Sequence, residues 1–370
     1  MEKRDKLILT AGPSITEKEI SYVTDAVSTG WNEHWNKYIL KFEELFAKYI
    51  GVKHAITTSS CTGAMHIALE SLGIKQGDEV IVPEITWLAT AAVPTYVGAK
   101  PVFVDIEEDT WCINLDSIKK AITSKTKAIM PVHLYGGLAK MDKIMDIAKQ
   151  NDLLVVEDAA PSLGSIYHEK KAGSFGDASA FSFQGAKVMT TGEGGMLLTN
   201  NDSTFKKVSK IANQGRSDTK PLWNDEIGLK YKISNIQAAL GLAQLERLEE
   251  FVEKKRKIFS WYKKRLYDID GIRMNTELPK TRNSFWMTTI VLEKDFGISR
   301  DVFMKKLRGW NIDSRPVFYP LSHMPMFETK HHKNAERFSE RGINLPSGYN
   351  LEEDDIDYIC NVVKEILNEK

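Results

Sequence analysis

Short apolar runs alternate with amphipathic segments over the first two-thirds of the chain. Runs of about four to eight residues that are rich in Val, Ile and Phe and bounded by Gly, Pro or Asp are typical of buried β-strands. We expect strands at residues 54–59, 78–84, 100–106, 127–134, 152–158, 178–183 and 194–200.

Helical patterns lie between these runs. Met65, Ala68, Leu69 and Leu72 recur at helical spacing, and Gly73 follows them as a C-cap signal. Repeated strand–helix–strand units predict an α/β fold in which helices flank a mostly parallel mixed sheet on both faces.

The pattern changes near residue 235. Residues 235–269 contain no proline and predict one long helical stretch that joins two lobes. Residues 284–292 and 312–320 then predict strands, and residues 354–367 predict a terminal helix. We therefore expect a large α/β domain over residues 1–250, including the N-terminal segment, and a smaller α+β domain over residues 251–370.

Composition narrows the function classes. The chain has 370 residues, of which 42% are hydrophobic, enough for a large core. Lys+Arg and Asp+Glu both number 50, so the balance indicates neither a nucleic-acid nor a membrane partner. No apolar stretch has the length of a signal peptide or a membrane span. The three cysteines have neither metal-ligand nor disulfide spacing, so we expect no metal site and a cytoplasmic location.

The first chemical candidate follows strand 54–59. Ser60, Cys61 and Thr62 stand where the strand turns into a helix. The free N–H groups and partial positive charge of a helix N-terminus favour a phosphate group. Taken alone, the segment is better explained by Ser60 or Thr62 serving only as an ordinary N-cap.

The second candidate is Asp158, which ends a strongly apolar strand. A carboxylate in that position is costly without a cationic partner. A pyridinium N–H would be such a partner, because an Asp opposite the ring nitrogen keeps it protonated and improves the ring as an electron sink. The alternatives are a helix N-cap and a metal ligand.

The third candidate is Lys187, in a connection between two strands that contains Gly185, Gly192, Gly194 and Gly195. Schiff-base chemistry needs an amine that loses its proton, and a desolvated lysine does so readily. By itself Lys187 is better explained as an ordinary surface lysine in a turn.

The combination and order of these three segments predict a pyridoxal 5'-phosphate (PLP) site of the aminotransferase type. The chain resembles the DegT/DnrJ/EryC1/StrS sugar aminotransferases along nearly its whole length, and is most similar to their perosamine-synthase-like members. The motifs that carry the resemblance are GDEVIVPEITWLAT, KAIMPVHLYG, VVEDAAPSLGS, FGDASAFSFQGAKVMTTGEGGMLLTN, KYKISNIQAALGLAQLERL, SRPVFYP and RGINLPS.

The resemblance implies the aspartate-aminotransferase (type I) fold and a role for each matching residue. Lys187 would hold PLP as a Schiff base and act as catalytic base and acid. Trp87 would stack on the cofactor ring, although a tryptophan there is also explained as a core residue. Ser182, Cys61 and Thr62 would bind the cofactor phosphate. Asn235 would reach the same phosphate across a dimer interface, so we expect a homodimer with shared active sites.

Departures from the family pattern concern the substrate side. Glu33 and His34 stand where relatives have small serines. Asn36 stands where relatives have a glycine, and we expect it to adopt the same left-handed backbone, which both residues tolerate. Pro161 replaces a side chain that would hydrogen-bond near the cofactor phenolate. Together with Glu33 and His34, the further candidates for substrate contact are Arg315, which suits a carboxylate or phosphate, and His323.

The reaction implied is transfer of an amino group from an amino acid, L-glutamate above all, to a keto group of a carbohydrate. The leading acceptor is a nucleotide-linked keto-deoxy-sugar used in cell-surface polysaccharide biosynthesis. The alternatives are a smaller keto sugar or triose phosphate, a PLP-dependent sugar dehydratase, and a non-enzymatic PLP-fold regulator. The dehydratase is disfavoured because such relatives replace the Schiff-base lysine by histidine.

Overall fold

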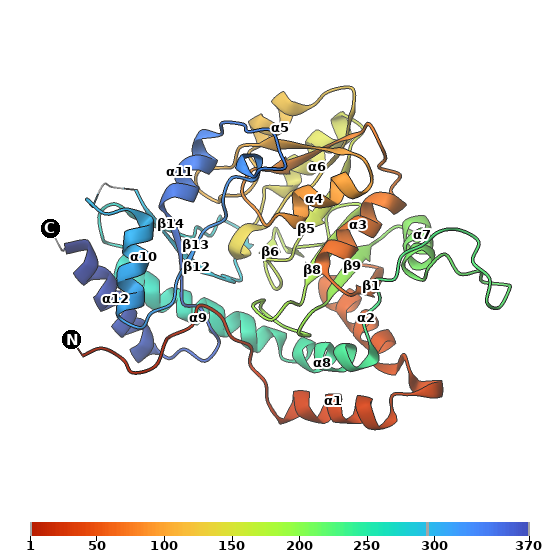
Figure 1. Ribbon diagram of the computed structural model, residues 1–370, viewed down its shortest axis with the longest axis horizontal. Helices are drawn as coiled ribbons and strands as arrows, with labels where there is room; N and C mark the ends of the chain where they lie inside the picture. Colours follow the sequence, from red (N-terminus) through yellow and green to blue (C-terminus); the bar gives the residue numbers. More distant parts are fainter. Residues whose placement is uncertain (1, 294–295, 369–370) are drawn as a thin grey trace.

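A seven-stranded sheet forms the centre of the computed structural model, which describes residues 2–293 and 296–368 (Figure 1). Its strand order is β1-β9-β8-β5-β4-β2-β3. The seven expected runs each coincide with one strand, shifted by a few residues at the ends. The strands are β1 (His54–Thr58), β2 (Glu79–Pro83), β3 (Lys100–Val104), β4 (Thr126–Ile129), β5 (Leu154–Asp158), β8 (Ala178–Ser182) and β9 (Gly195–Thr199).

Only β9 runs against its neighbours in this sheet. It pairs antiparallel with β1 and β8, whereas the remaining pairs are parallel. The connection between β8 and β9 contains no helix and turns directly back, as antiparallel neighbours allow. This connection carries Lys187 at the sheet edge where β1, β2, β5 and β8 end.

Helices cover both faces of the sheet (Figure 1). Both faces are apolar, because adjacent residues such as Val155 and Val156 on β5 enter different core clusters. The helices before residue 270 are α1 (Glu17–Thr29), α2 (Lys37–Ile50), α3 (Cys61–Ser71), α4 (Ala89–Tyr96), α5 (Leu115–Ala121), α6 (Met141–Gln150), α7 (Asp202–Ala212), α8 (Asn235–Leu245) and α9 (Leu248–Leu266), with short turns η1 (Asn32–His34) and η2 (Leu134–Gly136).

The expectation of one continuous helix over residues 235–269 was wrong. The stretch is divided into α8 and α9, and Arg247 is the N-cap of α9 with φ −111° and ψ 7°. The Arg247 side chain bonds Ser14, Glu19 and Glu250. These polar contacts fix the position of the break. The spacing of apolar residues could not predict them.

A second lobe follows α9. Its antiparallel sheet has the order β10-β12-β14-β13, and a small separate sheet has the order β11-β6-β7. Their bounds are β6 (Ile166–Tyr167), β7 (Lys170–Lys171), β10 (Ile272–Met274), β11 (Thr281–Arg282), β12 (Thr288–Leu292), β13 (Arg315–Pro316) and β14 (Gly342–Leu345). The other elements are α10 (Arg300–Gly309), η3 (Leu321–His323), α11 (Lys333–Arg341) and α12 (Glu353–Asn368).

Two contacts bear on the predicted domains. The expected boundary at residue 250 lies inside α9, which contributes Val252 to the core beside the large sheet and Ile258 to the core of the second lobe. The N-terminal segment also reaches the second lobe, because Ile8 forms a β-bridge with Ile312. No helix in the described part of the chain is both long and apolar enough to cross a bilayer.

Candidate active site

The loop that carries Lys187 is closed by backbone hydrogen bonds at both ends. Phe183 N–H donates to the Gly194 carbonyl oxygen at 2.9 Å, and Thr191 N–H donates to the Phe183 carbonyl oxygen at 2.8 Å. Gly194 has φ +157°, and a Cβ there would collide with Thr191. The glycines that the sequence placed beside Lys187 thus serve a tight return of the chain.

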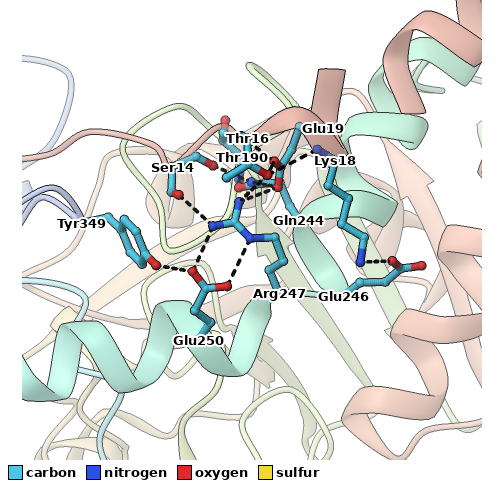
Figure 2. A network of polar contacts seen from close by, with 10 residues as sticks. All are labelled: Ser14, Thr16, Lys18, Glu19, Thr190, Gln244, Glu246, Arg247, Glu250 and Tyr349. Atoms are coloured by element: carbon cyan, nitrogen blue, oxygen red, sulfur yellow. Dashed lines mark hydrogen bonds and ion pairs between the residues drawn. The ribbon is translucent and has the colours of Figure 1, made fainter. Parts of the chain in front are cut away.

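A polar network ties this loop to the N-terminal segment and to the α8–α9 junction (Figure 2). Gln244 accepts a hydrogen bond from Thr190 N–H at 3.3 Å and donates to Glu19 Oε1 at 2.8 Å. Arg247 donates to the same Glu19 oxygen at 2.8 Å. Burial alone raises the pKa of Glu19, but bonds from Thr16, Arg247 and Gln244 outweigh it and hold the pKa at about 2.

We predict that Glu19→Gln lowers the free energy of unfolding at pH 7 by about 2–3 kcal/mol. Because the folded pKa is depressed, the stabilisation is present above about pH 4.5 and is lost as the pH falls towards 2. Urea unfolding at pH 7 and pH 3 measures the free energy of unfolding of both proteins. The difference between wild type and variant should be smaller at pH 3 than at pH 7. Glu17→Gln, on an exposed residue of the same helix turn, is the control. A gap independent of pH would contradict the prediction.

The Lys187 amine lies against an aromatic ring from the second lobe. Its Nζ is 3.7 Å from the centroid of Trp286, whose Nε1–H donates to the Ala186 carbonyl oxygen at 2.7 Å. Burial lowers the pKa of Lys187 to about 8, while the nearby Asp158 and Cys61 act in the opposite direction. The amine is therefore easier to deprotonate than an ordinary lysine.

Asp158 is buried at the carboxyl end of β5 and is 4% exposed. Thr90 Oγ1–H donates to its Oδ2 at 2.7 Å, and Ala160 N–H donates to its Oδ1 at 3.1 Å. Thr90 comes from α4, so the helix after β2 orients the carboxylate. Trp87 and Thr90 thus stand on the same connection and face the same edge of the sheet.

The start of α3 offers the expected amide groups. Ser60 is the N-cap and accepts from Gly63 N–H at 3.0 Å, which confirms the N-cap reading for Ser60. Cys61 and Thr62 occupy the first turn, whose N–H groups have no intrahelical acceptor. Gly195 approaches so closely that a Cβ on it would lie 2.6 Å from Cys61 N. Burial raises the pKa of the Cys61 thiol well above its usual range, so the thiol is neutral.

Ser182 and Trp87 complete the edge. Ser182 ends β8, and its Oγ accepts a long hydrogen bond of 3.4 Å from Gln184 N–H. Trp87 is 66% exposed, so the alternative that it is a core tryptophan is wrong. An exposed indole at the end of β2 is free to stack on a ligand ring.

Sequence reasoning missed the aromatic wall that joins Trp87 to Lys187. The Trp87 and Phe318 ring centroids are 6.0 Å apart, Phe318 stacks on Tyr135 at 5.5 Å, and Tyr135 lies 5.9 Å from Trp286. These side chains come from both lobes. The one local signal was that Trp87, Tyr135 and Phe318 lie within motifs used for the family resemblance, whereas Trp286 lies outside them.

His133, next to the same edge, is fully buried. Its Nε2 is 3.0 Å from Glu157 Oε2, and its Nδ1 accepts from Ala139 N–H at 3.3 Å. These bonds assign the ring proton to Nε2. His133 therefore supports the strand that carries Asp158.

Asn235 makes a different set of contacts within its own subunit. Its Oδ1 accepts from Tyr38 N–H at 2.9 Å, and its Nδ2 lies 3.5 Å from the carbonyl oxygens of Gly30 and His34. The residue thus fixes the segment between α1 and α2. In that segment Asn36 has φ −119°, so the expected left-handed backbone is not at Asn36 but at Asn32, with φ +51°.

The substrate candidates do not gather in one subunit. Glu33 and His34 are exposed on η1, beyond the end of α1. Arg315 is exposed on β13, which lies toward the opposite side of the view in Figure 1. His323 ends η3, where its Nε2 is 3.0 Å from the Lys330 carbonyl oxygen.

Comparison with known proteins gives one family. The model of the DegT/DnrJ/EryC1/StrS aminotransferase family matches residues 13–364. This chain belongs to that family. It is 41% identical to the GDP-perosamine synthase of Caulobacter vibrioides, over 97% of this chain and 98% of the relative. It is also 41% identical to the GDP-perosamine synthase of Escherichia coli O157:H7, over 99% of this chain and 100% of that relative. The PLP form of Spr1654 from Streptococcus pneumoniae matches with a TM-score of 0.91 and 28% identity over 98% of each chain.

The protein is therefore a PLP-dependent aminotransferase of the DegT/DnrJ/EryC1/StrS family, and the expected family, fold and cofactor are confirmed. The residues at the sheet edge fit the cofactor in chemistry. They include an amine with a depressed pKa, a buried carboxylate, first-turn amide groups and an exposed indole. PLP, when bound, supplies an electron sink for charge that develops on the donor substrate.

Proposed function

We propose that this sugar aminotransferase moves the amino group of L-glutamate to the keto group of a nucleotide-linked keto-deoxy-sugar. The observation that carries the proposal is similarity over the full chain to two proteins named GDP-perosamine synthase. The setting is polysaccharide biosynthesis, which the name of the related Bacillus subtilis protein SpsC also states, at 33% identity.

Each residue at the site has a part in this proposal. Lys187 Nζ would anchor the cofactor, then take the proton from the donor α-carbon and deliver it to the C4' carbon of the cofactor. Asp158 holds the proton on the ring nitrogen, and Trp87 stacks on the ring. Cys61 and Thr62, at the start of α3, and Ser182 receive the phosphate.

The acceptor is tested by a screen with the purified protein. Glutamate is mixed with single keto compounds, and 2-oxoglutarate is measured. We expect turnover with a nucleotide-linked keto-deoxy-sugar. Turnover with a simple keto sugar or a triose phosphate alone would favour the smaller acceptor instead. Alanine and glutamine in place of glutamate test the donor.

We further propose a homodimer whose active sites are shared. Two observations support it. The substrate candidates on η1 and β13 lie apart within one subunit. Large apolar side chains are also exposed from the end of α1 into the first turn of α2 and in the segment before α8, and such patches are typical of interfaces. They are Trp31, Trp35, Leu40, Leu222, Trp223 and Ile227.

Mixing an inactive variant with a weakened one tests the sharing. Lys187→Ala lacks the anchoring amine, and Asn235→Ala should weaken retention of PLP. If Asn235 acts across the interface, a heterodimer contains one site with both native residues and one with neither. Activity should then return after the two variants are mixed and allowed to re-equilibrate. If Asn235 acts within its own subunit, every site keeps one defect and mixing restores nothing.

A further inference from the structure

A histidine and carboxylate cluster lies in the second lobe, away from Lys187. Glu336 Oε1 stands between two imidazoles, at 2.9 Å from His331 Nδ1 and 3.4 Å from His323 Nε2. One ligand atom from each of the three residues lies within 4.8 Å of the others. We propose that His323, His331 and Glu336 form a binding site for a divalent transition-metal ion, with Zn²⁺ as the best fit.

The donor set selects the ion. Two imidazole nitrogens and one carboxylate oxygen suit Zn²⁺, Ni²⁺ and Cu²⁺, whereas Mg²⁺ and Ca²⁺ prefer oxygen ligands alone. Ligand atoms about 2.0–2.2 Å from a tetrahedral Zn²⁺ are separated by roughly 3.3–3.6 Å. The two contacts to Glu336 are close to this separation, so small side-chain rotations would complete the geometry. The Lys330 carbonyl oxygen, 3.0 Å from His323 Nε2, adds an oxygen at the same place.

The Ser322 side chain holds the segments of the two histidines together. His323 and His331 belong to segments joined by Ser322, which donates to the Lys330 carbonyl oxygen at 3.2 Å and accepts from Lys330 N–H at 3.0 Å. Ser322 is itself fully buried, and its N–H donates to Glu84 Oε1 at 2.7 Å. The loop from residue 323 to residue 331 is therefore closed without the ion, which limits the entropy that binding must remove.

A second polar pair lies behind the cluster. Glu84 is fully buried, and its Oε2 has no hydrogen-bond partner among the described residues. It lies 3.5 Å from His332 Nε2, which is also buried and unpartnered. Because Glu84 follows β2 and precedes Trp87 by three residues, bound metal would stiffen the contact between the second lobe and the active-site edge.

Calorimetric titration of ZnCl₂ into the tag-free, PLP-loaded protein tests the proposal. We expect one Zn²⁺ per chain in the wild type, and binding at least about 100-fold weaker in the His331→Gln/Glu336→Gln variant. The control His168→Gln/Glu340→Gln removes one exposed histidine and one exposed glutamate elsewhere and should bind like the wild type. If zinc bound to the cofactor instead, both variants would still bind it.

Two results would overturn the site. One is the absence of Zn²⁺ binding by the wild type, in which case Glu336 only forms ion pairs with histidine. The other is equal binding by the His331→Gln/Glu336→Gln variant and the wild type. A thermal unfolding series gives an independent readout, because an ion bound only to the folded state raises Tm with its concentration. That increase should be present in the wild type and control and missing in the double variant.

Discussion

Replacing Lys187 with alanine is expected to abolish turnover, with a loss of more than about 10³-fold, because the variant lacks both the covalent anchor and the proton-transfer group. Folding should be preserved, since removing the buried amine relieves its desolvation and gives up a contact with the Trp286 ring but no ion pair among the described residues. Steady-state assays with glutamate, together with thermal unfolding, measure the two effects separately. Activity within about tenfold of the wild type would exclude Lys187 as the catalytic lysine.

A labelling experiment separates Lys187 from a rival. Burial lowers the pKa of Lys255 to about 8 as well, so an easily deprotonated amine does not by itself identify the catalytic residue. Lys255, however, is 4% exposed, and its ammonium group donates to the carbonyl oxygens of Trp286 and Ser347. Borohydride reduction of the PLP-loaded protein should therefore fix the cofactor on the peptide that contains Lys187. Cofactor on the Lys255 peptide would overturn the assignment.

The sequence predicted the edge of the sheet well because its signals are local. Each buried strand is a short apolar run closed by Gly, Pro or Asp, and parallel strands end on the same side. Once β1, β5 and β8 are recognised, the order of the chain places Cys61, Asp158 and Ser182 at that side. The return of the chain through Gly194 and Gly195 places Lys187 there as well.

Features that depend on distant partners could not be predicted in this way. Trp286 contacts Lys187 from a loop about 100 residues later in the chain. The sequence around Trp286 predicts only the start of a strand. The break at Arg247 depends on Glu19 and Ser14 from the N-terminal segment. The cluster of His323, His331 and Glu336 has no standard metal-ligand spacing, because a loop brings its members together.

Asp158→Asn is expected to slow removal of the donor α-proton by about 10³-fold while the fold stays intact. The reason is charge. Asparagine has nearly the shape of aspartate and still accepts the bond from Thr90 Oγ1–H, but it no longer stabilises a proton on the ring nitrogen. Rapid mixing of the PLP-loaded variant with glutamate, followed by absorbance of the cofactor, isolates this half-reaction from the acceptor.

Thr90→Val is the matched variant for Asp158, because it keeps the charge and removes one bond that orients the carboxylate. A hydrogen bond to a charged group contributes about 1.5–3 kcal/mol, so we expect a loss of roughly tenfold, well short of that in Asp158→Asn. Similar losses in both variants would mean that position matters more than charge. If Asp158→Asn reacts at the wild-type rate, the carboxylate serves only to accept the Ala160 N–H bond at the end of β5, and the ring nitrogen must be held by another group.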